Sequence, residues 1–188
     1  MTLEVIILAA GHGSRMQSST AKVLHRLAGQ PLVSHVLGTA RRLGASRIHV
    51  VVGHDADAVQ DAVDAPDVQC HLQREQLGTG HAVQQAIDHC DIDSTVLVLF
   101  GDVPLIRSDS LGEVISAASS GLAALSSLLP DPTGYGRILR DASGTFQAVV
   151  EERDATELAA MAAAEEAPCV KRTRTGRAPP SETKVQLP

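Results

Sequence analysis

The sequence predicts a Rossmann-like α/β fold with a doubly wound, mostly parallel sheet. Three short apolar runs, at residues 5–8, 47–53 and 95–100, lack the alternation of a half-exposed strand and are typical of strands buried on both faces. Segments with the apolar spacing of helices separate these runs along the chain. A glycine-rich loop directly follows the first run, at the strand end where ligands bind in open α/β sheets.

Strands and helices are expected to alternate along the rest of the chain. After the strand at residues 5–8, a helical pattern opens at Gln30-Pro31 and ends near Leu43, where Gly44 stops it. The other expected elements are strands at residues 47–53, 68–72, 95–100 and 122–129, helices at 55–63, 79–89 and 109–119, and a hairpin that pairs 137–140 with 145–151.

The character of the chain changes towards its C-terminus. Residues 158–166 are rich in Ala and Glu and predict a helix, whereas residues 168–188 are basic, rich in Pro and Thr, and lack apolar periodicity. We therefore expect an ordered domain over residues 1–167 and a disordered basic tail over residues 168–188. A nucleic-acid-binding arm is the alternative for the tail, but its five cations come without aromatic residues.

Composition excludes several classes of function. Residues 1–168 carry 11 cations against 21 acids, and this acidic body argues against nucleic-acid binding. The three cysteines, Cys70, Cys90 and Cys169, show no CxxC spacing, so neither a disulfide framework nor a zinc site is expected, and reduced thiols favour a cytoplasmic protein. No signal peptide and no apolar run of membrane-spanning length is present, so no membrane partner is expected.

The glycine-rich loop has the composition that a polyphosphate requires. Its glycines let backbone N–H groups approach phosphate oxygens, while Arg15 and the nearby Lys22 supply cations. It matches neither the Walker motif nor the Rossmann fingerprint, whose third glycine is replaced by Met16. The alternative is an ordinary turn beside two surface cations. The loop reads Leu8-Ala9-Ala10-Gly11-His12-Gly13-Ser14-Arg15-Met16.

Two further clusters are expected at the same edge of the sheet. Gln73 can match the donor and acceptor edge of a base, and the following glycines permit close approach while Thr79 caps a helix. Asp102 directly follows a buried strand, which suits Mg²⁺ held by a carboxylate and substrate phosphates. The alternatives are a flexible N-cap loop for the first cluster and an acid that caps a turn for the second.

A third cluster surrounds the only tyrosine of the chain. Glycines flank Tyr135 in a turn that can form a lid or face a sugar, and Glu151 can accept hydrogen bonds from sugar hydroxyls. Taken alone, this cluster is better explained by an ordinary Pro/Gly turn and a solvated acid pair.

These motifs together resemble one family. The loop at residues 8–16, with Lys22, resembles the signature of sugar-phosphate nucleotidyltransferases. The segments at residues 23–25, 76–82, 101–104 and 131–137 are similar to the uridyltransferase domain of bacterial bifunctional N-acetylglucosamine-1-phosphate uridyltransferases/glucosamine-1-phosphate acetyltransferases. The likeness covers about residues 3–156.

The resemblance implies a GT-A-like nucleotide-binding fold, Mg²⁺, and the reaction UTP + N-acetylglucosamine 1-phosphate → UDP-N-acetylglucosamine + pyrophosphate, which supplies peptidoglycan and lipopolysaccharide synthesis. It implies homotrimers formed by a part of the family's chain that is absent here. By matching position, it assigns uridine contacts to Leu8, Ala9, Ala10, Gly11, Gln73, Gly78 and Thr79, phosphate binding and catalysis to Arg15 and Lys22, the metal to Asp102, further substrate contacts to Phe100 and Gly101, and the amino sugar to Gly136 and Glu151.

The chain also departs from the family's pattern. Ser14, Ala21 and Phe100 replace the usual Thr, Pro and Tyr. Past Thr156 the pattern is lost, because Arg174 stands where an Asn-Thr-Gly strand would place its Asn, and the acetyltransferase half is missing. The sequence therefore indicates a truncated or frame-shifted domain that is incomplete at its C-terminus. Two alternatives stay open: a nucleotide-binding remnant without turnover, and a transferase for another sugar phosphate or cofactor.

Overall fold

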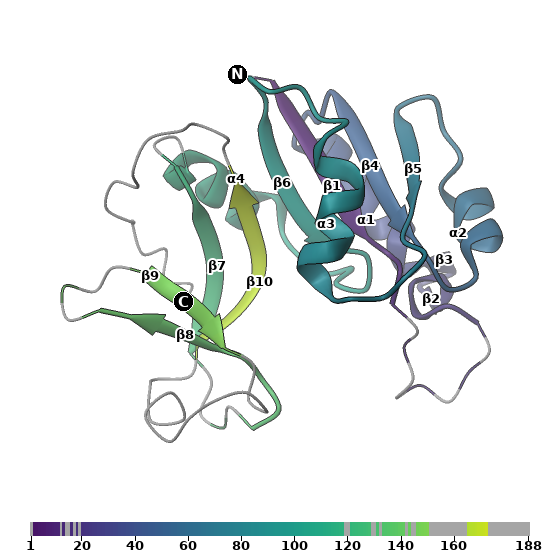
Figure 1. Ribbon diagram of the computed structural model, residues 1–188. Coiled ribbons are helices and arrows are strands. Elements are labelled where there is room, and N and C mark those ends of the chain that lie inside the picture. The colour runs from purple at the N-terminus through teal and green to yellow at the C-terminus, as the bar shows by residue number, and fades with distance from the viewer. Residues whose placement is uncertain are drawn as a thin grey trace. The chain divides into compact units, whose positions relative to one another are not determined.

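The computed structural model divides the chain into two compact units, residues 1–112 and 113–188 (Figure 1). The described residues are 2–11, 13, 16, 18, 20–118, 121–128, 131, 133–141, 143, 146–150 and 165–172. Among these residues, no helix combines the length and the apolar character that crossing a membrane requires.

The first unit is built on four parallel strands in the order β5-β4-β1-β6. Their bounds are Leu3–Leu8 for β1, Arg47–Val52 for β4, Val68–Leu72 for β5 and Thr95–Phe100 for β6. In the register of the sheet, Leu8 lies beside both Val51 and Phe100. The carboxyl ends of these strands therefore meet at one edge, as the three buried apolar runs predicted.

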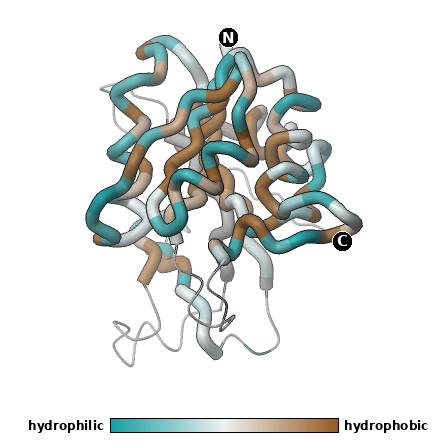
Figure 2. The backbone as a smooth tube through the Cα atoms, turned by 90° about the vertical axis from the view of Figure 1, so that its right-hand side faces the viewer, coloured by the Kyte–Doolittle hydropathy of each residue, from teal (hydrophilic) through white to brown (hydrophobic). Residues whose placement is uncertain are grey.

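Helices cover both faces of this sheet. The helices are α1 (Leu32–Arg42), α2 (Ala56–Val63) and α3 (Thr79–Ile87). Ala82 and Ala86 of α3 pack on Ile6, Val51 and Val98 of the strands, and Figure 1 shows α3 and α1 on opposite sides of β1. Figure 2 shows long brown, hydrophobic stretches that alternate with teal, hydrophilic ones along the backbone. The doubly wound arrangement is thus confirmed.

Three short elements in this unit were not predicted. Between β1 and α1 lie a 3-10 turn, η2 (Lys22–Leu24), and a two-stranded ribbon of β2 (Arg26–Leu27) and β3 (Gln30–Pro31). The predicted helix start at Gln30 is therefore wrong by two residues. Pro31 lies in a strand conformation with ψ of 147°, and the helix begins at Leu32.

The second unit contains antiparallel strands. The hairpin of β8 (Arg137–Arg140) and β9 (Phe146–Val150) confirms the predicted pairing. A second pair joins β7 (Ala123–Leu128) to β10 (Glu165–Arg172). Helix α4 (Ser108–Ala117) spans the division between the units.

Strand β10 corrects the expectations for the end of the chain. A helix was predicted up to Glu166 and disorder from Pro168, yet residues 165–172 form a strand and the predicted boundary at residue 167 falls inside it. Helix propensity and composition are local signals, whereas pairing with β7 is a non-local contact that overrides them. The remaining parts of both predictions, residues 158–164 and 173–188, lie outside the described residues, and the division into domain and tail stays a prediction there.

Candidate functional site

A cavity of about 400 Å³ lies at the carboxyl ends of β1, β5 and β6 in the first unit. Ligands of open α/β sheets bind at this edge. The cavity is lined by Leu8, Ala9, Ala10, Gly11, Gly13, Met16, Lys22, Val23, Gln73, Gln76, Gly78, Thr79, Ala82, Phe100 and Asp102.

Most of the predicted site residues line this one cavity. They are Leu8, Ala9, Ala10, Gly11, Lys22, Gln73, Gly78, Thr79, Phe100 and Asp102. Three regions far apart in the sequence, around residues 8–22, 73–79 and 100–102, thus meet at one place. Gly136 lies in the second unit, in the turn before β8, while Arg15 and Glu151 lie outside the described residues.

Gly101 contributes to the packing beneath the cavity and is not part of its lining. Its N–H donates to the carbonyl of Leu8 at 2.9 Å. A Cβ at this position would lie 3.1 Å from both that carbonyl oxygen and Cγ1 of Val23. The absence of a side chain therefore lets the ends of β1 and β6 approach the segment that carries Lys22.

Two glycines shape the loop after β1 in different ways. Gly13 has a φ of +59°, and a Cβ there would lie 2.7 Å from Cβ of Lys22. Gly13 is therefore required for the close passage of the lysine segment. A Cβ on Gly11, in contrast, meets no described atom within 4 Å. Since Gly11 lines the cavity, a side chain there would occupy ligand space without disturbing the fold.

An ion pair spans the cavity wall between Lys22 and Asp102. Nζ of Lys22 lies 2.6 Å from Oδ2 of Asp102, and the two side chains are 41% and 28% exposed. Lys22 belongs to η2, and Asp102 follows the end of β6. Asp102 is the only acidic residue among the described residues that line the cavity. The pair thus presents one cation and one oxygen donor to the same space.

Asp102 fits the requirements of a magnesium ligand. Mg²⁺ in nucleotide sites uses one or two carboxylates together with phosphate oxygens and water. The carboxylate of Asp102 faces the cavity and is partly open to solvent, and Lys22 contacts Oδ2, which leaves Oδ1 for a cation.

Gln73 is fixed in place by the loop that follows it. Its side chain is only 4% exposed, and Nε2 donates to the carbonyl of Gly78 at 3.3 Å and to Nδ1 of His81 at 3.0 Å. His81 is itself contacted by Gln85 at 3.2 Å. With its amide nitrogen engaged, Gln73 offers chiefly its carbonyl oxygen to a ligand. The sequence predicted that both ends of the amide were available.

The start of α3 also differs from the prediction. Thr79 is the first helical residue, the N-cap is Gly78 with φ of +103°, and no side chain caps the helix. The expectation that Thr79 caps α3 is therefore wrong, because glycine alone readily adopts the backbone conformation that this turn requires. The N-terminal end of α3 borders the cavity through Gly78 and Thr79.

Two polar residues that hold the loops were not singled out from the sequence. Nε2 of Gln76 donates to the carbonyl of Ala10 at 2.8 Å, across 66 residues of sequence. Oδ2 of Asp55, a residue with φ of +58°, accepts the N–H of Ala21 at 3.4 Å. In the sequence, Gln76 is marked only as a polar residue in a glycine-rich loop. That position does not reveal that its hydrogen-bond partner is Ala10.

The fold and the cavity define an α/β protein of the nucleotide-binding class. The glycine-rich loop, the helix N-terminus and the Lys22–Asp102 pair all lie at the carboxyl edge of a parallel sheet, where such proteins hold phosphates. The chain belongs to the MobA-like NTP transferase domain family, whose model matches residues 5–166.

Curated relatives agree with this family. The chain is 54% identical to the bifunctional protein GlmU of Chromohalobacter salexigens over 158 residues, 84% of this chain and 35% of the relative. It is 56% identical to GlmU of Burkholderia orbicola over 155 residues, 82% of this chain and 34% of the relative. The chain thus spans about a third of the length of these proteins.

The fold is also similar to a putative glucose-1-phosphate thymidylyltransferase from Bacillus anthracis, solved in complex with a sucrose. The TM-score is 0.70 at 18% sequence identity, over 92% of this chain and 72% of that one. At this identity the likeness supports the fold alone.

Proposed function

We propose that this chain transfers a uridylyl group from UTP to N-acetylglucosamine 1-phosphate, which yields UDP-N-acetylglucosamine and pyrophosphate. One observation supports this most directly: residues 8–11, Gln73, Gly78 and Thr79 line one cavity together with Lys22 and Asp102. The uracil and ribose would lie against the first group, and the phosphates against the second.

The chemistry is an in-line displacement that needs no covalent enzyme intermediate. A phosphate oxygen of the sugar phosphate attacks the α-phosphorus of UTP, a new P–O bond forms, and the bond to the bridging oxygen breaks as pyrophosphate leaves. The protein contributes position and charge. The backbone around Gly11 and the first turn of α3 hold the nucleotide, and Lys22 neutralises phosphate charge as it develops.

Asp102 has two roles in this proposal. It holds Lys22 towards the cavity through the 2.6 Å ion pair, and its carboxylate would hold Mg²⁺ together with phosphate oxygens. The ion supplies charge neutralisation to the triphosphate. Arg15, which the resemblance assigns to phosphate binding, is proposed as a second cation.

The proposal extends to the sugar side and to the setting of the reaction. Gly136 and Glu151 are proposed to face the amino sugar. The product is proposed to serve peptidoglycan and lipopolysaccharide synthesis in the cytoplasm, and homotrimers are proposed for the longer family members.

A nucleotide-binding remnant is the second candidate function. It is favoured by the loss of the family's Asn-Thr-Gly pattern beyond Thr156, since the cavity residues described above all belong to the nucleotide half of the proposed site. In that case UTP would bind with little or no transfer. Even a small misplacement of the sugar phosphate would lower the rate by orders of magnitude.

Two measurements on the purified 188-residue chain test these candidates. Calorimetry with UTP, CTP and GTP in the presence of Mg²⁺ identifies the nucleotide, and UTP is expected to bind most tightly. Pyrophosphate release with N-acetylglucosamine 1-phosphate, and with glucose 1-phosphate as control, measures transfer. Release with the amino sugar supports the proposal, while UTP binding without release supports the remnant. Preference for CTP or GTP would contradict both.

A further inference from the structure

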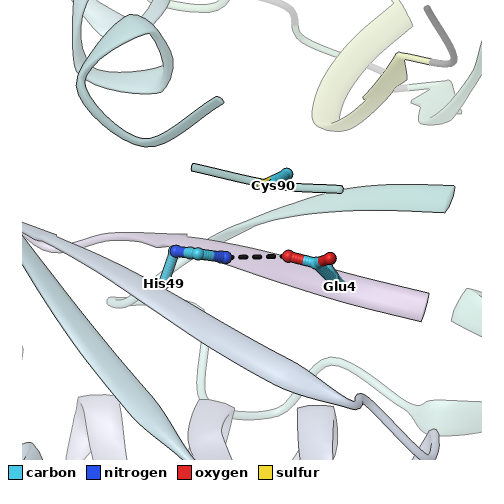
Figure 3. Close-up of side chains that lie close together, drawn as sticks. All are labelled: Glu4, His49 and Cys90. Atoms are coloured by element: carbon cyan, nitrogen blue, oxygen red, sulfur yellow. Dashed lines mark hydrogen bonds and ion pairs between the residues drawn. The ribbon is translucent and has the colours of Figure 1, made fainter. Parts of the chain in front are cut away.

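A second group of reactive side chains lies in the first unit, away from the nucleotide cavity. Glu4 on β1 and His49 on β4 face Cys90, which follows the C-terminal end of α3 (Figure 3). One ligand atom from each residue lies within 4.8 Å of the other two. The cavity, in contrast, borders Leu8 at the other end of β1 and the N-terminal end of α3.

This group is buried in the sheet face that α3 covers. Glu4 is 3% exposed, His49 is fully buried, and Cys90 is half-buried beside the hydrophobic cluster of Ile6, Val96 and Ala86. A carboxylate in such a place is expensive unless it is paired with a cation or bound to a metal. His49 lies 2.9 Å from this carboxylate, and a cation bound between the three side chains would pair with it as well.

We propose that Glu4, His49 and Cys90 bind one zinc ion. Imidazole nitrogen, thiolate sulfur and carboxylate oxygen are the ligands that Zn²⁺ takes in proteins, and three protein ligands with water in the fourth position form a common type of site. The carboxylate and the thiolate together carry two negative charges, which balance the ion. A neutral metal centre suits a buried position better than an isolated charge does.

The contacts around the ligands resemble the outer shell of a metal site. Nε2 of His49 points to Oε2 of Glu4 at 2.9 Å, and its Nδ1 lies 2.9 Å from Nε2 of His71 on β5. The other carboxylate oxygen, Oε1 of Glu4, accepts the N–H of Asp91 at 3.0 Å. Metal-binding histidines characteristically donate their second ring N–H to such a neighbour, and ligating carboxylates are hydrogen-bonded in turn. These hydrogen bonds thus already orient the side chains of His49 and Glu4.

His71 is suited to accept that hydrogen bond. Its Nε2 lies 2.9 Å from Nδ1 of His49, and the residue is buried. The ring of His89 stacks against it with centroids 4.6 Å apart. In the zinc-bound state, Nε2 of His49 binds the ion and its Nδ1–H donates to Nε2 of His71.

Cys90 binds zinc as a thiolate, so its thiol must lose a proton when the ion binds. As the Zn–S and Zn–N bonds form, the Cys90 thiol proton leaves to solvent, and neutral His49 carries its one ring proton on Nδ1, so that Nε2 can bind the ion; no electron is transferred. Zinc bonds of about 2.0–2.3 Å place ligand atoms roughly 3.5 Å apart, and the three ligand atoms here lie within 4.8 Å of one another, so only small shifts are needed to bind the ion. Cys90 lies in a turn after α3, and its Sγ contacts the carbonyl of Ala86 at 3.7 Å.

The spacing of the three ligands along the chain does not predict this site. Glu4 and His49 are 45 residues apart, and only the pairing of β1 with β4 and the packing of α3 bring the three ligands together. Zinc here would fasten the turn after α3 to the sheet, independently of the nucleotide cavity.

The test uses Co²⁺ as a spectroscopic substitute for zinc in the purified full chain. A Co²⁺–thiolate bond gives a charge-transfer absorption that a carboxylate site such as Asp102 cannot produce. We expect this band to saturate at one ion per chain, to disappear on addition of excess Zn²⁺, and to be lost in Cys90→Ser. Cys70→Ser and Cys169→Ser are matched controls that should retain it. His71→Ala should weaken Co²⁺ and Zn²⁺ binding roughly 10- to 100-fold.

A second measurement uses the unaltered chain, so that it does not depend on whether a variant folds. Zn²⁺ should slow alkylation of Cys90 by iodoacetamide, measured by peptide mass spectrometry, without slowing that of Cys70, and EDTA should reverse the effect. Absence of the Co²⁺ band, its persistence in Cys90→Ser, or equal protection of Cys70 and Cys90 would overturn the site.

Discussion

The two ends of α3 border polar groups that differ in burial: those near its N-terminal end are partly exposed, and those near its C-terminal end are largely buried. At its N-terminal end lies the nucleotide cavity, lined by backbone, small residues and the partly exposed Lys22–Asp102 pair. Near its C-terminal end lie Glu4, His49 and Cys90, whose side chains contact one another inside the core. The same helix and the same sheet thus support an open site at one end and a closed cluster at the other.

The difference shows how burial decides what a polar group contributes. At the cavity, loops and solvent leave cations and oxygen donors available to a ligand, so we expect substitutions to change binding and rate while stability is kept. In the closed cluster each group has a protein partner, and removing one partner leaves the other unsatisfied. There we expect substitutions to change stability first.

The largest effect is expected from breaking the closed pair. His49→Leu leaves the carboxylate of Glu4 buried without its partner and should lower the free energy of unfolding by about 3–5 kcal/mol. Urea unfolding with EDTA present measures this. The double variant with Glu4→Val should recover much of the loss, since well-packed apolar residues often replace a buried pair without cost. A double variant no more stable than His49→Leu would show that the loss of stability does not come from the unpaired Glu4 carboxylate.

At the open end, Lys22→Ala should lower kcat/KM for uridylyl transfer about 10²- to 10³-fold, because a positioned charge on the phosphates is lost. Its unfolding free energy should stay near that of the unaltered chain, since the side chain is 41% exposed. Arg107→Ala, which removes an exposed cation outside the cavity, is the control. Equal rates for the two variants would refute the role of Lys22.

Gly11→Val should lower UTP affinity at least about tenfold, or about 1.4 kcal/mol, because the new side chain enters ligand space. The fold should be kept, since a Cβ there meets no described atom within 4 Å. Gly80→Ala is the matched control, because its Cβ also meets nothing within 4 Å and Gly80 does not line the cavity. If calorimetry of Gly11→Val gave an unchanged UTP affinity, UTP would not bind beside Gly11 in this cavity.

A smaller effect is expected from the bond that joins two loops of the cavity. Gln76→Ala removes the donor to the carbonyl of Ala10 and should cost about 1 kcal/mol of binding energy, seen as a roughly fivefold rise in KM for UTP. Gln69→Ala, at an exposed position of β5 that does not line the cavity, controls for the loss of an amide. Equal KM values for both variants would leave Gln76 without a positioning role.

The smallest effect concerns an exposed pair, Arg41 and Asp67, whose atoms approach to 2.7 Å. The hydrogen bond from Arg41 lowers the pKa of Asp67, so the pair stabilises the fold above the ordinary Asp pKa of about 4 and this stability is lost as pH falls through the lowered value. Because both side chains are more than a third exposed, Arg41→Ala should cost under about 1 kcal/mol at pH 7 and nothing near pH 2. A loss that persists at pH 2 would point to packing instead of charge.

Local patterns in the sequence predicted most of the fold and much of the candidate site. The buried runs around Ile6, Val50 and Val98 and the helical spacing after Pro31 depend on residues a few positions apart, and these elements formed where they were expected. Local chemistry predicted part of the cavity, because glycines and polar residues at the ends of parallel strands meet at one edge. The family resemblance supplied the remaining lining residues, Leu8, Ala9, Ala10 and Phe100.

The sequence by itself therefore determined the α/β class, the edge of the sheet that carries the cavity, and most of the cavity's lining. The tertiary structure alone decided which distant groups became partners: Gln76 with Ala10, Glu4 with His49, and β10 with β7. The physical reason is range. Hydrophobic periodicity and turn chemistry act over a few residues, whereas strand register and helix packing set contacts between residues dozens of positions apart, which no spacing in the sequence records.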